Sequence, residues 1–153
     1  MKNKKLWLFV AFIFVVAICL VFAYGKKAEA PLQEKSESKI NYTNSSADLI
    51  VVDLPYPDAV TGKDFSVIGK ARGTWFFEAS FPIKVLDKDG NTLATAIAQA
   101  QSDWMTENFV PFKADVKIPQ SYIGKATLIL KKDNPSGLPE HDASISFPIN
   151  IEY

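Results

Sequence analysis

The hydrophobic and polar residues divide the chain into three regions of different pattern. Residues 6–24 form an apolar run without a charge, residues 25–47 are polar, and residues 48–153 carry short segments of alternating hydrophobic and polar residues. Alternation with a period of two is typical of β-strands that bury one face. The pattern therefore predicts an all-β domain over residues 48–153, preceded by an apolar segment and a linker.

Seven strands are expected in the β region, and no long amphipathic helix. The clearest turn is a hairpin at Asp89 and Gly90, where we expect Gly90 to have a positive φ. Residues 92–101 have some helix propensity, but their place directly after this turn favours a strand. The expected strands cover residues 49–53, 65–72, 81–86, 92–101, 109–118, 125–132 and 144–152.

This strand pattern predicts an immunoglobulin-like antiparallel sandwich of about seven strands. The disulfide found in the core of many such domains cannot form, because the only cysteine lies in the apolar run. Trp75, Trp104 and the phenylalanines must therefore fill the space between the sheets. Pro82, Pro111 and Pro148 fall inside expected strands and should mark edges or bulges, because proline has no N–H for the ladder.

The consecutive residues Trp75, Phe76, Phe77 and Glu78 pose a geometric problem for this sandwich. Adjacent residues of a strand point to opposite faces, so the three rings cannot all face the core. We expect either Phe76, or Trp75 together with Phe77, to face outward or to lie in a bulge. An outward ring would leave an apolar patch on the surface.

The apolar run at residues 6–24 has the length of a membrane-spanning helix. At about 1.5 Å per residue it would extend roughly 28 Å, close to the ~30 Å hydrocarbon core of a bilayer. An uncleaved anchor is favoured over a cleaved signal peptide, because the run exceeds the usual length of a signal-peptide core. Lys2, Lys4 and Lys5 precede it, so the positive-inside rule places residues 1–5 in the cytoplasm and the later domain outside.

Residues 25–47 are rich in serine, asparagine and charged residues, which indicates a flexible tether. Residues 1–27 hold five of the 17 basic residues and none of the 17 acidic residues, so residues 28–153 carry a net charge of −5. Sequence-independent nucleic-acid binding depends on positive charge that neutralises phosphates. We therefore expect no nucleic-acid partner.

Two loops contain residue types that can bind cations. Residues 87–91 (DKDGN) look like the start of a calcium loop, but the glycine is fourth rather than sixth and no glutamate is twelfth, which favours a plain hairpin turn. Residues 133–142 would offer a cation site, although a solvated loop between two strands is favoured there. The candidate ligands of that loop are Asp133, Glu140, His141 and Asp142.

His141 is the only histidine, and Ser136 and Asp142 lie near it in sequence. A catalytic triad needs a base held rigidly between a nucleophile and an acid, and a loop broken by proline and glycine offers no such geometry. The chain also lacks a glycine-rich phosphate loop, a CxxC pair and an HExxH motif. We expect no enzyme activity, no catalytic residue, no cofactor and no metal site.

Acidic residues next to aromatic runs point to a candidate interaction surface. Exposed rings can stack on sugars or peptides, and a neighbouring carboxylate can add hydrogen bonds. The alternative is that the rings form the core and the acids cap turns or accept backbone N–H bonds, which a sandwich without disulfides favours. The candidate residues are Trp75, Phe76, Phe77, Glu78, Asp103 and Trp104.

Two longer motifs carry a family resemblance. The runs G-x-A-x-G-x-WFFE at residues 69–78 and DWMT-x-x-F-x-PF at residues 103–112 resemble the immunoglobulin-like domain of bacterial spore germination proteins, the domain that accompanies the GerMN domain. The likeness continues through the turn at Asp89 and Gly90 and the DNPSG run at residues 133–137. It covers nearly all of residues 48–153.

The resemblance implies an immunoglobulin-like sandwich in an extracytoplasmic bacterial protein, and it brings no catalytic residues with it. A role in sporulation or germination and a general role in the cell envelope both fit. The leading hypothesis is a membrane-anchored, non-catalytic binding or scaffolding module that contacts an envelope protein or a cell-wall polymer. The alternative is a glycan- or peptidoglycan-binding accessory domain that serves a wall hydrolase on another chain.

Overall fold

The computed structural model describes residues 40–153. The expected cytoplasmic segment at residues 1–5, the apolar run at residues 6–24 and most of the expected tether lie outside this part of the chain. Within residues 40–153, no helix is long and apolar enough to cross a membrane.

All seven expected segments form strands, and two short strands that the pattern did not predict join them. One of these, β1, lies inside the expected tether and pairs with β9, so the folded domain begins before residue 48. The strands are β1 (Asn41–Thr43), β2 (Ile50–Leu54), β3 (Val60–Thr61), β4 (Asp64–Arg72), β5 (Ser80–Leu86), β6 (Thr92–Ala100), β7 (Phe109–Lys117), β8 (Gly124–Lys131) and β9 (Ser144–Ile151). Two 3-10 helices, η1 (Gly73–Trp75) and η2 (Pro139–His141), lie in the connections.

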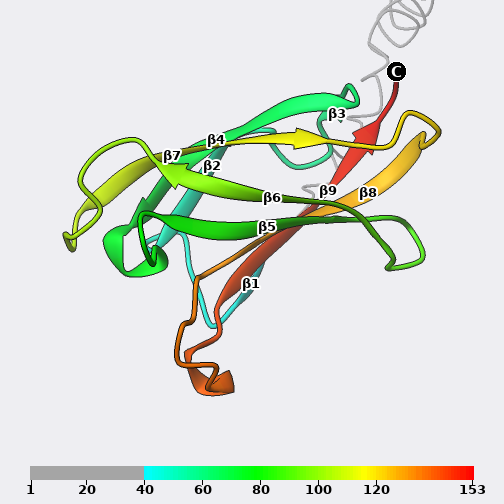
Figure 1. Ribbon diagram of the computed structural model, residues 1–153. Helices are drawn as coiled ribbons and strands as arrows, with labels where there is room; N and C mark the ends of the chain where they lie inside the picture. Colours follow the sequence, from blue (N-terminus) through cyan, green and yellow to red (C-terminus); the bar gives the residue numbers. More distant parts are fainter. Residues whose placement is uncertain (1–39) are drawn as a thin grey trace, which may run out of the picture. The chain divides into compact units, whose positions relative to one another are not determined.

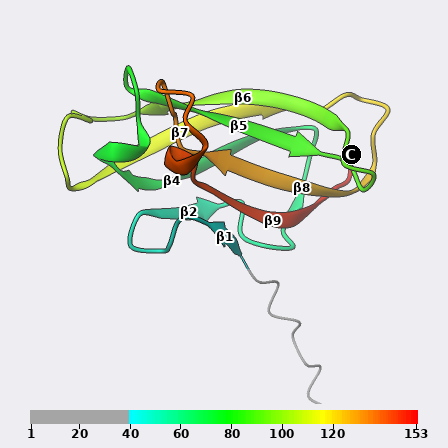
Figure 2. The same ribbon diagram turned by 90° about the horizontal axis from the view of Figure 1, so that it is seen from below.

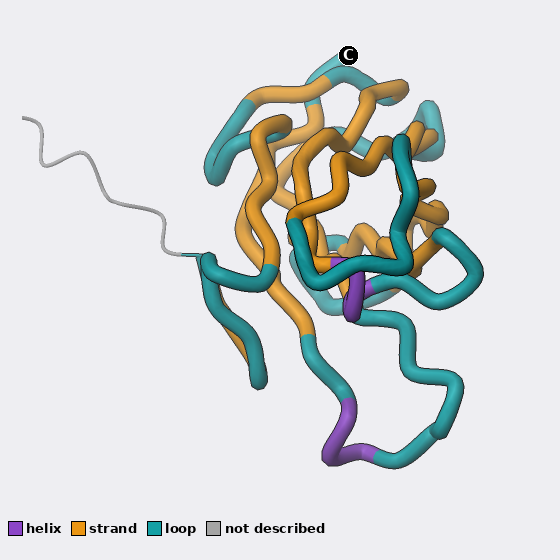
Figure 3. The backbone as a smooth tube through the Cα atoms, turned by 90° about the vertical axis from the view of Figure 1, so that its left-hand side faces the viewer, coloured by secondary structure: helices purple, strands orange, loops and turns teal. Residues whose placement is uncertain are grey.

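The strands form one curled sheet in the order β1-β9-β8-β5-β6-β7-β4-β2, and β3 adds a parallel pair to β9. All other pairs are antiparallel. β1 and β2 stand at the two ends of this order but follow each other in the chain, so the curl brings the two ends of the sheet together (Figure 2). Viewed along the strands, the sheet surrounds a common interior (Figure 3).

The ladder between β6 and β7 is short. Only two residue pairs join the strands, Gln99 with Lys113 and Ala100 with Phe112. This short link divides the sheet into a half made of β2, β4 and β7 and a half made of β6, β5, β8, β9 and β1. The immunoglobulin-like arrangement arises because these halves pack on each other through their apolar faces.

Aromatic rings join the two halves around Phe81 of β5. The Phe81 ring contacts Phe112 of β7 at a centroid distance of 4.9 Å, Phe76 at 5.2 Å and Trp75 at 5.8 Å, each edge to face. All four side chains are buried. The expectation that aromatic residues take the place of a core disulfide is therefore confirmed for these rings.

The expected alternation at Trp75, Phe76 and Phe77 is wrong. Trp75 and Phe76 are both buried, and only Phe77 reaches solvent, with 43 % of its surface exposed. The reason is local: Trp75 ends the 3-10 helix η1, and Phe76 and Phe77 lie outside the regular strands. The period of two applies only to an extended strand, so two successive rings can turn inward here.

The three prolines lie where the ladder does not need their N–H. Pro148 sits on the outer side of β9 between its two short partners, and its carbonyl accepts a hydrogen bond from the N–H of Asp58 on that side. Pro111 faces β6 at the end of the two-residue link, where its carbonyl accepts from Gln101. Pro82 lies one residue beyond the β5–β8 ladder, which starts at Ile83. The expectation of edge strands or bulges is wrong, because β5, β7 and β9 are interior strands, and each proline is accommodated where its neighbouring ladder is interrupted.

The hairpin between β5 and β6 has the predicted turn, with Gly90 at a φ of +86°. The Asp87 carboxylate accepts hydrogen bonds from the N–H of Asp89 and from the N–H and the side-chain amide of Asn91, at 2.8–2.9 Å. The bond from the Asn91 side chain, followed by that from its backbone, lowers the pKa of Asp87 below the ordinary value of 3.8. The Asp87 carboxylate, which would be the first ligand of a calcium loop, therefore accepts hydrogen bonds that stabilise the hairpin turn.

We predict that Phe81→Ala lowers the free energy of unfolding by about 3–5 kcal/mol, because it leaves a cavity where three rings meet. Phe77→Ala should cost less than about 1 kcal/mol, since that ring is half exposed. Urea denaturation of both variants measures the two values. Equal losses would contradict this assignment of inner and outer rings.

We predict that the Asp87 carboxylate makes the stability of the domain depend on pH. Its folded pKa is lowered, so its contribution is present above about pH 3.8 and is lost as the pH falls through the folded value. Urea denaturation of the wild type and of Asp87→Asn between pH 7 and pH 3 should show a gap that narrows below about pH 4. A gap of constant size would contradict this role.

Candidate interaction surface

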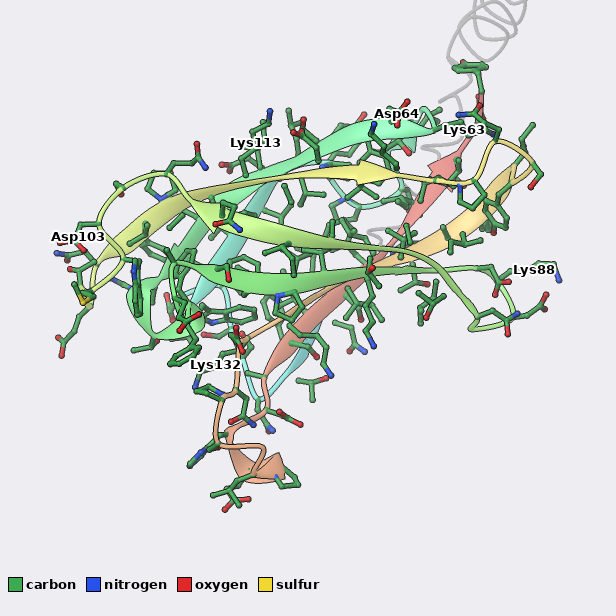
Figure 4. All side chains as sticks on the ribbon, in the orientation of Figure 1. Lys63, Asp64, Lys88, Asp103, Lys113 and Lys132 are labelled. Atoms are coloured by element: carbon green, nitrogen blue, oxygen red, sulfur yellow. The ribbon has the colours of Figure 1, made fainter. Side chains whose placement is uncertain are left out.

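Three connections gather at one end of the domain, which we call the loop end (Figures 1 and 2). They are residues 73–79 between β4 and β5, residues 101–108 between β6 and β7, and residues 132–143 between β8 and β9. Asp103 lies at this end, whereas Lys88 in the β5–β6 hairpin lies at the opposite end (Figure 4). The loop end therefore holds all the residues of the predicted interaction surface.

Gly73 brings the first two of these connections into direct contact. A Cβ at this position would lie 1.9 Å from the carbonyl oxygen of Thr106 and 2.3 Å from that of Trp104. Its N–H also donates to the carbonyl of Asn108 at 3.3 Å. Any side chain here would separate the two connections, which gives a physical reason for the second glycine of the G-x-A-x-G run.

Arg72 connects several segments of the chain at the loop end. Its guanidinium group lies 4.1 Å from the centre of the Phe109 ring and donates to the carbonyls of Asp48 at 3.0 Å and Glu107 at 3.3 Å. The stacked cation and the two hydrogen bonds join β4, the start of β7 and the chain before β2. These contacts hold the segments that carry the loops in a fixed arrangement.

Residues 101–108 present a methionine to solvent. The Asp103 carboxylate accepts a hydrogen bond from the N–H of Met105 at 3.0 Å, and the Trp104 carbonyl accepts from Thr106 at 2.8 Å. These bonds turn the chain so that the Trp104 side chain packs against the core while Met105 stays 77 % exposed. Asp103 thus accepts a backbone N–H bond. This agrees with the alternative given above, in which the acidic residues next to the aromatic runs stabilise turns.

A strained turn stands next to the exposed ring of Phe77. Phe77 and Ser80 exchange two backbone hydrogen bonds, at 3.0 and 3.1 Å, around Glu78 and Ala79. Glu78 has a φ of +49° and Ala79 a φ of +62°, in a turn that normally takes asparagine and glycine. Each left-handed residue of this kind costs of order 1–2 kcal/mol. The turn holds the exposed Glu78 side chain beside Phe77 despite that cost.

The structure divides the six predicted surface residues into two groups. Trp75 and Phe76 are buried, so they cannot form part of an accessible surface, and Trp104 is only partly exposed. Phe77, Glu78 and Asp103 are exposed. The sequence analysis did not include Met105 among the surface residues. Its place in the polar DWMT run could have pointed to it, because methionine is common at adaptable binding surfaces.

The third connection at the loop end contains the candidate catalytic residues. Ser136 Oγ lies 3.0 Å from His141 Nδ1, but it also donates to Asn134 Oδ1 at 2.5 Å. The hydroxyl has one proton, so His141 Nδ1 must donate to Ser136 instead of accepting from it. Asp142 accepts from Asn134 rather than from His141. This network orders the loop without activating Ser136 as a nucleophile.

A shallow pocket of about 180 Å³ opens beside this connection. Its polar lining comes from Asn44, Thr74, Lys132, Glu140, His141 and Asp142. Within residues 40–153, no group of three or more histidine, cysteine, aspartate or glutamate side chains lies close enough together to hold a metal ion. The structure therefore gives no support to the cation site that residues 133–142 could have offered.

Lys63 is a buried charged residue that the sequence did not single out. Its ammonium group donates to the carbonyl of Tyr122 and to that of Glu152 at 3.4 Å. Both bonds tie the β7–β8 connection to the segment after β9. Because its partners are backbone carbonyls away from the loop end, we assign Lys63 a structural role.

A comparison with protein-family models identifies the family of this domain. The family model described as the immunoglobulin-like domain of bacterial spore germination matches residues 49–137. Comparisons with curated proteins and with solved structures found no match.

We predict that Ala79→Gly raises the free energy of unfolding by about 0.5–1 kcal/mol, because glycine adopts the left-handed conformation without steric cost. Ala96→Gly is the matched control in a regular strand and should lower stability by about 0.5–1 kcal/mol or more. Thermal or urea denaturation of the two variants gives the sign of each change. A loss in both would show that the turn is not strained.

Proposed function

The chain belongs to the family of immunoglobulin-like domains of bacterial spore germination, and from this membership we propose that it is a non-catalytic binding or scaffolding module of the bacterial cell envelope. The apolar run at residues 6–24 anchors it in the membrane, and the β domain lies outside the cytoplasm. If the run is cleaved, the domain is secreted. Sporulation or germination is one setting that the family suggests.

The loop end is the surface that we assign to binding. Its supporting observation is the combination of two exposed apolar side chains, Phe77 and Met105, with two exposed carboxylates, Glu78 and Asp103. Apolar groups rimmed by polar ones are typical of protein-binding surfaces. The strained turn at Glu78 supports the same assignment, because backbone strain is usually retained where a function requires it.

The kind of exposed side chain favours a protein partner over a glycan. Sugar-binding platforms need flat aromatic faces that are open to solvent, and tryptophan is well suited to them. Here Trp75 is buried and Trp104 packs against the core, which leaves Phe77 as the exposed ring among the predicted residues. Phe77 and the flexible Met105 fit an apolar pocket or groove on another envelope protein. A cell-wall glycan remains the second candidate because one ring and two carboxylates are accessible.

We predict that a photo-crosslinking side chain at Met105 or Phe77 captures a protein partner in the living bacterium. The same group at Ile123, which is 70 % exposed outside the loop end, should capture nothing specific. Glu78→Lys and Met105→Ala should each weaken binding of the captured protein by tenfold or more, the size expected for a central contact.

Purified cell wall separates the two candidates. Binding of the protein to wall stripped of proteins, lost on Phe77→Ala, would favour the glycan-binding accessory function. No crosslink at either loop-end position and no binding to wall would contradict the assignment of this surface.

A further inference from the structure

One half of the sheet has strands without any acidic residue. The charged residues of β1, β5, β6, β8 and β9 are three lysines, Lys84, Lys125 and Lys131. Residues 40–153 as a whole carry 14 acidic and 10 basic side chains. The domain is therefore acidic overall, whereas the charge of these five strands is purely positive.

The three lysines share the outer face of this half. Lys84 of β5 lies between two buried residues, and in β8 Lys125 and Lys131 each stand next to one. Adjacent residues of a strand point to opposite faces, so all three ammonium groups project outward. Within residues 40–153, both ion pairs involve other lysines, so none of the three has a carboxylate partner. We call the outer face of β1, β5, β6, β8 and β9 the basic face.

Aliphatic side chains lie between the charges of the basic face. Ile129 of β8 pairs with Lys84, and Ile97 of β6 pairs with Pro82, two residues from Lys84. Directly paired residues lie on the same side of a sheet. Ile97 is 52 % exposed, and Ile129 is partly exposed. The basic face therefore combines unpaired cations with accessible apolar groups.

The other half of the sheet has a different charge pattern. Its strands β2, β4 and β7 carry Asp53, Asp64 and Asp115 among their basic residues. The Asp115 carboxylate pairs with the Lys113 ammonium group at 3.2 Å and accepts a hydrogen bond from Ser66 at 2.6 Å. Positive charge is partly neutralised there, so the two outer faces of the domain differ in the partner that they favour.

The chain enters the domain at the border of the basic face. β1 is the last strand of this half and pairs with β9. Fifteen residues separate the apolar run at residues 6–24 from Ile40. A flexible chain of this length has a root-mean-square end-to-end distance of roughly 20 Å. A membrane anchor at residues 6–24 would thus keep the basic face within reach of the lipid headgroups.

We propose that the basic face lies on the anchoring membrane and binds the phosphate groups of anionic phospholipids. A lysine near an anionic bilayer raises the binding constant roughly fivefold, so three together contribute about a hundredfold. Ile97 and Ile129 can enter the interface between the headgroups. A dissolved polyanion offers no such apolar environment, so the mixture of lysines and aliphatic groups favours a bilayer.

This inference rests on the membrane anchor of the proposed function and adds an orientation to it. The strands then lie along the membrane, and the loop end faces sideways. Phe77 and Met105 are directed toward a neighbouring protein of the same membrane rather than toward the cell wall. The loop end and the basic face use different residues, so each can be tested without the other.

The test places the full chain, with Cys19→Ser, in liposomes that contain an acceptor dye on the headgroups. A donor dye is attached at Thr95→Cys on the basic face or at Ile68→Cys on the outer face of β4, both exposed positions. Packed sheets lie about 10 Å apart, so the two labels are on opposite sides of the domain and the Thr95 label should transfer energy about twofold more efficiently. This difference should require phosphatidylglycerol and should vanish in phosphatidylcholine alone or in about 0.5 M salt.

Charge reversal identifies the residues responsible. Lys84→Glu with Lys131→Glu should abolish the difference between the labels in anionic liposomes. Lys113→Glu with Lys117→Glu is the matched control in β7 and should leave the difference unchanged. Circular dichroism and urea denaturation verify that both double variants are folded.

Equal transfer from the two labels, in chains that float with anionic liposomes, would overturn the orientation and leave the loop-end assignment intact. A difference that persists after reversal of Lys84 and Lys131 would also overturn it. Equal transfer together with binding to purified cell wall that these reversals abolish would assign the basic face to an anionic wall polymer instead. A chain that fails to float with any liposome would contradict the membrane anchor, and this inference would fall with it.

Discussion

The packing of aromatic rings around Phe81 is the interaction on which the rest of the domain depends. The described part of the chain has no cysteine, so no disulfide joins the two halves of the curled sheet. Phe81 of β5 instead contacts Phe112 of β7 in the other half, and Trp75 and Phe76 close the cluster. Burial of such rings stabilises in proportion to the apolar area removed from water, and the edge-to-face contacts set their orientation.

The same cluster shapes the loop end. Phe76 is held inside, and β5 begins at Ser80 with Phe81 inside again, so the chain must reverse within a few residues. That constraint explains why Glu78 and Ala79 take left-handed conformations although neither is glycine. It also leaves Phe77 outside, next to an exposed carboxylate. Core packing and the candidate binding surface are therefore two consequences of one short segment.

Much of the fold could be predicted from local sequence patterns. Where the prediction was wrong, the cause was also local. The seven longer strands follow from alternation and turn residues, and the hairpin at Gly90 follows from turn chemistry. β1 and β3 were missed because two or three residues are too few to show a period. The inward orientation of both Trp75 and Phe76 was missed because a 3-10 helix replaces the strand that the alternation argument assumed.

By itself, the sequence determined the all-β class, the positions of the longer strands along the chain, the absence of a disulfide and the family motifs, because each can be read from the residues without knowing which segments meet in space. Only the tertiary structure decided which aromatic rings reach solvent and why Gly73 must be small. These properties depend on contacts between segments far apart in sequence, such as Gly73 with Thr106 and β6 with β7, and no local pattern records them.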